Sequence, residues 1–66
     1  MRKLTYVACI SDGHYGTIDI EKDIYIKEDT KENRAAARKE FINTLTNSQR
    51  DMLESIELLD DVEVAI

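Results

Sequence analysis

Two segments with alternating apolar residues, separated by a short loop, constrain the fold of this chain most strongly. Apolar residues occupy every second position from Leu4 to Ile10, which is typical of a β-strand with one buried face. The next segment alternates in the same way from Ile18 to Ile26 and is interrupted only by Lys22. The loop between them contains both glycines of the chain and several other turn-forming residues. We therefore predict a β-hairpin.

The two predicted strands differ in their outer faces. The first carries the apolar Val7 and Cys9 on its second face as well, so we expect it in the middle of the sheet. The second strand, residues 17–27, is expected to contain a bulge near Lys22. An alternative breaks it at residues 21–23 into two short strands. We favour one strand, because no glycine or asparagine there supplies the positive φ of a tight hairpin turn.

A first helix is predicted after the hairpin. Asp29 and Glu32 have the spacing of a helix-capping box, and three successive alanines follow them. We therefore predict a helix over residues 30–45. Its buried stripe is expected at Ala37, Phe41 and Leu45.

A second helix and a third strand are predicted in the remaining residues. Residues 46–49 have the pattern of another capping box, which predicts a helix over residues 47–59. The tail, residues 62–66, alternates again and predicts a third strand. The apolar stripe of the helix is Met52, Leu53, Ile56 and Leu59, and the strand would turn Val62, Val64 and Ile66 toward the helices.

These elements predict a single α+β domain over residues 1–66 with the order ββααβ. Following the chain direction, the third strand returns beside the first and parallel to it. The result is a three-stranded sheet in the order 2-1-3 with both helices packed on one face. The opposite face stays open, with Thr5, Val7 and Cys9 at its centre and Asp19, Glu21, Asp23, Tyr25 and Glu63 around them.

Acidic side chains are concentrated in the last third of the chain. Residues 51–66 hold six acidic and no basic side chains, whereas residues 31–50 hold five basic and two acidic ones. On the predicted second helix, Asp51, Glu54 and Glu57 recur every three residues and would form a row of carboxylates. Such a row can imitate nucleic-acid phosphates and bind a basic groove. The alternative is the solvated side of an amphipathic helix.

The predicted partner-binding surface combines this row with the acidic residues of the second strand. Its partner would be a host protein with a basic surface, bound through complementary charge. The residues are Asp19, Glu21, Asp23, Asp51, Glu54, Glu57, Asp60, Asp61 and Glu63.

Basic residues on the predicted first helix give a competing interpretation. Lys31, Arg34, Arg38 and Lys39 would form a basic stripe there. Such a stripe can contact a phosphate backbone, or it can pair with Glu32, Glu40 and the acidic second helix, within one molecule or across a homodimer. We expect the pairing, and we do not expect the chain to bind nucleic acid directly.

Few residues here are suited to chemistry. Cys9 and His14 are the only cysteine and the only histidine, and they fall in a strand and in a loop. A zinc site would need more such ligands. The carboxylates lie on solvated faces, where nothing shifts a pKa toward acid-base catalysis. We therefore predict no enzyme activity, no cofactor and no metal site.

Composition also bears on location. No apolar run approaches the length of about 18 residues that a membrane span needs, and the first residues lack the apolar core of a signal peptide. The lone cysteine agrees with a reducing compartment. We therefore expect a cytoplasmic protein.

In size, charge and architecture, the whole chain resembles the small acidic inhibitors encoded by bacteriophages, including anti-CRISPR proteins. It shares with them a two-strand start, a helical middle and carboxylates near the end, and no motif carries the resemblance. The resemblance implies a phage or mobile-element protein that blocks a host nucleic-acid-handling or defence protein. Two alternatives remain: a nucleic-acid-binding regulator using the first helix, and an assembly subunit that forms a homodimer through the open sheet face.

Overall fold

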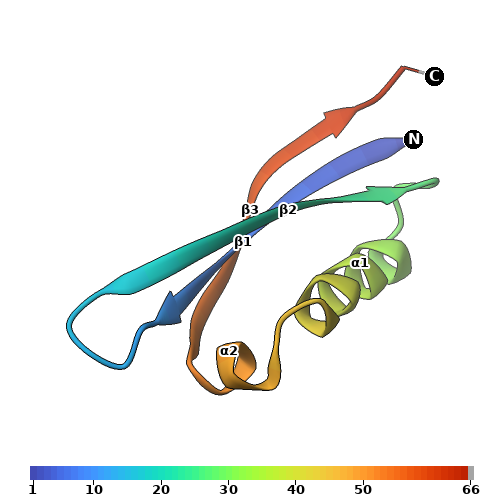
Figure 1. The fold of residues 1–66 in the computed structure, drawn as a ribbon. Coiled ribbons are helices and arrows are strands. Elements are labelled where there is room, and N and C mark those ends of the chain that lie inside the picture. The colour runs from blue at the N-terminus through green and yellow to red at the C-terminus, as the bar shows by residue number, and fades with distance from the viewer. Residues whose placement is uncertain (66) are drawn as a thin grey trace.

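The chain forms one three-stranded sheet with two helices on the same side of it (Figure 1). The computed structural model describes residues 1–65. The sheet order is β2-β1-β3, so the predicted α+β class, the ββααβ order and the central place of the first strand are confirmed. The elements are β1 (Arg2–Ser11), β2 (Thr17–Ile26), α1 (Lys31–Asn43), α2 (Asn47–Asp51) and β3 (Leu53–Glu63).

β1 and β2 form the predicted hairpin. Leu4 lies opposite Ile24 and Ala8 opposite Ile20, so one face of the hairpin collects the apolar residues of both strands. The register is continuous from Ser11 back to Arg2, and the bulge predicted near Lys22 is therefore wrong. Lys22 is exposed where it stands, so no extra residue is needed to turn it toward solvent.

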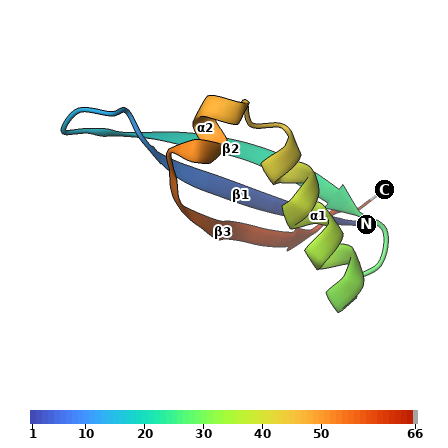
Figure 2. The same cartoon turned by 90° about the horizontal axis from the view of Figure 1, so that it is seen from below.

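The core lies between the sheet and α1, which crosses one face of the sheet (Figure 2). Phe41 is fully buried, and its ring stacks on that of Tyr6 with centroids 5.7 Å apart. The predicted helical stripe is confirmed, because Ala37, Phe41 and Leu45 are all buried. The complete core is Leu4, Tyr6, Ala8, Ile10, Ile24, Ile26, Ala37, Phe41 and Leu45.

The first turn of α1 is capped differently from the prediction. The N-cap is Thr30, whose side-chain oxygen accepts a hydrogen bond from the backbone N–H of Asn33. The capping box predicted for Asp29 and Glu32 is wrong. The carboxylate of Asp29 instead accepts a hydrogen bond from Arg34.

The second helix is much shorter than predicted, and the third strand is longer. The predicted capping box is present, since Thr46 and Gln49 bond to each other's backbone, but α2 ends at Asp51. β3 begins at Leu53 and runs antiparallel to β1, so the predicted helix over residues 47–59 and the parallel strand over residues 62–66 are both wrong. The short α2 is not long enough to bring the chain back across the sheet. The chain therefore runs back along the sheet as β3 itself, which makes β3 antiparallel to β1.

Backbone pairing explains why this segment is a strand although its apolar spacing suits a helix. β3 pairs with β1 from Arg2 to Ile10, whereas a strand of five residues would leave much of that edge of β1 unpaired. Leu53 and Ile56 still pack against the core from their strand positions. Tertiary pairing has thus overridden a local helical pattern.

The revised strand changes where the tail residues point. Val62 lies opposite Lys3 on the open face, so its predicted inward direction is wrong. The register shifts between Thr5 and Tyr6 and again between Cys9 and Ile10, which marks two irregularities in β3. The prediction for Ile66 lies outside the described residues.

Candidate functional site

The sheet face opposite the helices carries the candidate site. β1 contributes Thr5, Val7 and Cys9 at its centre, because these residues alternate with the buried core residues. In β2, Asp19 lies opposite Cys9, and Glu21 lies opposite Val7. Directly opposite residues in an antiparallel pair point to the same face. The open face predicted from the sequence therefore carries these two carboxylates, and Asp23 opposite Thr5 is the third.

β3 brings three more carboxylates to the same face from the other side. Glu57 lies opposite Val7 and Asp60 lies opposite Thr5. Glu54 falls at a register shift, and its carboxylate accepts a weak hydrogen bond from Cys9 Sγ at 3.8 Å. We call the six residues of the two outer strands the acidic sheet face: Asp19, Glu21, Asp23, Glu54, Glu57 and Asp60.

The charge of the acidic sheet face is not offset by nearby cations. All six of its acidic residues are exposed, and none makes an ion pair within residues 1–65. Asp23 accepts a hydrogen bond of 2.6 Å from the buried hydroxyl of Thr5, which fixes one carboxylate over β1. In the register, Lys3 is the one basic residue on this side of the sheet among the described residues, and it lies near the end of β1. The face is therefore strongly negative.

A shallow depression runs along the centre of the acidic sheet face. Its volume is about 350 Å³. Val7, Cys9 and Leu59 give it apolar walls, and Glu21 and Glu57 flank it from the two outer strands. An apolar floor between carboxylates suits the aliphatic stem and charged head of a lysine or arginine side chain.

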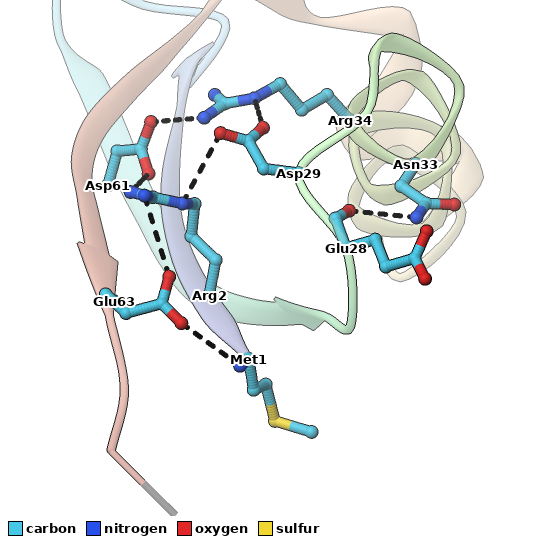
Figure 3. A network of polar contacts seen from close by, with 8 residues as sticks. All are labelled: Met1, Arg2, Glu28, Asp29, Asn33, Arg34, Asp61 and Glu63. Atoms are coloured by element: carbon cyan, nitrogen blue, oxygen red, sulfur yellow. Dashed lines mark hydrogen bonds and ion pairs between the residues drawn. The ribbon is translucent and has the colours of Figure 1, made fainter.

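Two of the predicted partner-binding residues, Asp61 and Glu63, form ion pairs within the chain. They belong to an ion-pair cluster on the helix side of the sheet (Figure 3). Arg2 Nη1 lies 2.7 Å from a carboxylate oxygen of Asp61, and Arg34 bonds the other oxygen. Glu63 lies 3.6 Å from Arg2 Nη2 and 3.3 Å from the N-terminal amine. Asp61 and Glu63 therefore make ion pairs within the chain and lie off the open face, where Glu63 was expected.

The ion-pair cluster perturbs its own acids. Hydrogen bonds from Arg34 and then Arg2 hold the pKa of Asp61 below its ordinary value, and the Arg34 hydrogen bond does the same for the pKa of Asp29. The cluster ties the start of β1, the end of β3 and the first turns of α1 together. Its role in this fold is to join these elements.

These shifts predict how stability depends on pH. Because the pKa of Asp61 is lower in the folded state, its contribution is present above the unfolded value of about 4 and is lost as pH falls through the folded value. We expect Asp61→Asn to unfold at a lower urea concentration than wild type at pH 7, and the gap to close as the pH falls below about 4. Asp51→Asn is the control, since Asp51 is exposed and makes no ion pair within residues 1–65. A gap that stays constant with pH would contradict this role.

The predicted carboxylate row on a second helix does not form. Asp51 is in α2, whereas Glu54 and Glu57 are in β3, so the three do not share a helical face. The structure instead brings Glu54 and Glu57 beside the acids of β2. The sequence signal that was missed is the length of the segment: residues 53–63 match β1 in length and can pair along all of it.

The basic residues of α1 lie on the other side of the molecule. Arg34 belongs to the ion-pair cluster, while Lys31, Arg38 and Lys39 are exposed and make no ion pair among residues 1–65. The predicted pairing of this helix with an acidic second helix inside one molecule is therefore wrong, although Arg34 does pair with Asp61 of the acidic last third. The helix side therefore carries both signs of charge, whereas the acidic sheet face is negative.

The structure places the remaining candidates apart from one another. Cys9 is half-buried on the open face of β1, and His14 is exposed in the hairpin loop. Across residues 1–65, no group of three His, Cys, Asp or Glu side chains could hold a metal ion. In the same residues, neither helix has the length and apolarity needed to cross a bilayer. Comparisons with family models, curated proteins and solved structures gave no match.

Proposed function

We propose that this chain is a non-enzymatic binding protein of phage or mobile-element origin. It blocks a host nucleic-acid-handling or defence protein in the cytoplasm by covering that protein's basic surface with the acidic sheet face. The observation that supports this proposal is the set of six exposed carboxylates on one side of the sheet, with no cation near its centre in the described residues.

The sheet geometry gives the charges a regular spacing. Alternate residues on one strand are about 7 Å apart, and the two outer strands lie about 10 Å from each other across β1. Such an array presents negative charge to a basic groove as a phosphate backbone does, and it would displace the counterions of the groove. The apolar depression adds contact area at its centre.

The assembly alternative is less well supported by this arrangement. A homodimer formed through the open face would press the six carboxylates of each copy against those of the other, which costs free energy. The regulator alternative retains one observation, the exposed Lys31, Arg38 and Lys39 of α1. A mobility shift of labelled duplex DNA that disappears when these three residues become alanine would favour it.

The proposal is tested by affinity capture from host lysate with three matched baits. The baits are wild type, a face variant with Asp19→Asn, Glu21→Gln and Glu57→Gln, and a control variant with Glu32→Gln, Glu40→Gln and Asp51→Asn. Each variant loses the same charge, but the control positions lie on the helices.

We expect one basic host protein to be captured by wild type and by the control, to be released as salt rises, and to be lost with the face variant. The captured protein should also lose its nucleic-acid binding when this chain is added. Capture that is equal for all three baits would refute the proposal.

A further inference from the structure

β2 is an edge strand with an unpaired side. The sheet order places β2 beside β1 only, and no further strand within residues 1–65 pairs with it. Its ten residues keep one unbroken register with β1, unlike β3 with its two register shifts. Natural edges are usually protected by bulges, by shortness or by charge. β2 has only charge.

Hydrogen bonding shows which backbone groups of β2 point outward. The N–H of Ser11 donates to the carbonyl of Met52 at 2.9 Å, so the odd-numbered residues of β1 direct their peptide groups toward β3. In an antiparallel pair, bonded and non-bonded residues alternate. The even-numbered residues of β2 therefore bond to β1. The outward N–H and C=O groups belong to its odd-numbered residues, which include Asp19, Glu21 and Asp23.

The same three residues disfavour the pairing of two copies through this edge. Directly opposite residues share a face, so a two-fold antiparallel pairing of β2 with a second β2 places acidic residues opposite acidic residues. The registers that overlap most of the strand all have this result. A strand with basic residues at alternate positions would face favourable charge instead.

The other face of the edge offers apolar contact. Ile18 is 55% exposed on the helix side of β2. A groove of about 290 Å³ lies there between the end of the hairpin and α2, lined by Ile10, Ile18 and Met52. A strand added beside β2 would have one set of alternate side chains on the helix side, where the one nearest Ile18 meets this groove, and the other set beside the three carboxylates.

We propose that β2 is the docking edge for an extended segment of the partner, in which lysine or arginine alternates with apolar residues. The segment adds a fourth strand to the sheet, as in β-strand addition. Main-chain bonds to the odd-numbered residues of β2 hold the segment, its basic side chains pair with Asp19, Glu21 and Asp23, and its apolar side chains contact Ile18. This inference rests on the proposed function, because it specifies the form that the basic partner takes.

The test uses two ten-residue peptides of equal composition. In one, lysine and valine alternate; in the other, the lysines form one block and the valines another. Amide hydrogen exchange of the full chain is followed by NMR with each peptide. We expect the alternating peptide to slow exchange about tenfold at the amides of Asp19, Glu21 and Asp23 and to leave those of Ile20 and Lys22 unchanged.

A second arm uses Ile18→Ser, a change at an exposed position that preserves the charge. We expect it to weaken the alternating peptide about threefold to tenfold and to leave the block peptide unaffected. Equal binding of both peptides, with no protection at the three outward amides, would overturn the docking edge and leave the proposed function standing as charge recognition by the whole face. If the face variant lost capture in lysate but neither peptide slowed amide exchange in β2, the docking edge would likewise be overturned and the proposed function would stand.

Discussion

Phe41→Ala is expected to remove a large part of the free energy of unfolding of this protein. The ring of Phe41 is fully buried and stacks on Tyr6, so its removal loses burial and leaves a cavity. Such truncations cost about 3–5 kcal/mol. A domain of 66 residues has a stability of roughly 3–10 kcal/mol on the usual scale per residue, so the loss takes up much of it. Urea unfolding followed by circular dichroism at 25 °C measures the change.

The control for this prediction is a truncation to alanine at a less buried position of the same helix. Ile42→Ala removes a half-buried neighbour on the same helix and should cost clearly less, while Phe41→Leu should recover most of the stability lost with alanine. If Phe41→Ala and Ile42→Ala had equal effects, α1 would not be anchored to the sheet through Phe41 as the structure shows.

The hairpin and first helix could be predicted because their local patterns agree with their tertiary contacts. Leu4, Ala8 and Ile24 alternate as strand residues and also meet α1 in the core. Phe41 has helical spacing from Ala37 and is buried with it. Where local and long-range preferences coincide, a single sequence is sufficient to predict the element and its buried face.

The segment after α2 could not be predicted because its two preferences conflict. Met52, Leu53, Ile56 and Leu59 have helical spacing, and the capping box at Thr46 is real, so local evidence extends the helix. Backbone hydrogen bonding to the otherwise unpaired edge of β1 decides that the segment is a strand. This edge exists only in the folded sheet, so the local sequence does not show it. Register then determines which face each acid occupies.

The strand conformation of residues 53–63 alters which residues form the candidate site, but the site remains a negatively charged sheet face. Asp19, Glu21 and Asp23 were placed correctly, because the hairpin alternation determines their face. Glu54 and Glu57 reached the same surface by a different route, in a strand instead of a helix. Asp61 and Glu63 were misplaced, because no sequence pattern shows that Arg2 and Arg34 lie beside them.

The two sides of the sheet differ in whether their acidic side chains are paired with basic ones. On the helix side, Arg2 and Arg34 neutralise Asp29 and Asp61, and these ion pairs join the start of β1, the end of β3 and α1. On the open side, no comparable compensation exists among residues 1–65. Like charges on one face lower stability by self-repulsion, so an uncompensated acidic sheet is better explained by binding than by folding.

That contrast leads to the second large expected effect, which is on affinity for a cationic ligand. A twelve-residue oligolysine serves as the probe for a basic groove. If the six carboxylates of the acidic sheet face act together, polyelectrolyte behaviour sets an upper limit of about a thousandfold loss in affinity between 50 and 200 mM salt. The face variant with Asp19→Asn, Glu21→Gln and Glu57→Gln keeps three of the six charges, so the slope of log K against log salt should fall to about half.

The matched variant with Glu32→Gln, Glu40→Gln and Asp51→Asn has the same net charge, so it separates local from global electrostatics. Isothermal titration at several salt concentrations gives both slopes. We expect the helix-side variant to retain the steep dependence of wild type, because its substituted residues lie off the acidic sheet face. Identical slopes for the two variants would mean that oligolysine responds to net charge alone, and the arrangement of carboxylates on the sheet would then have no bearing on what this chain binds.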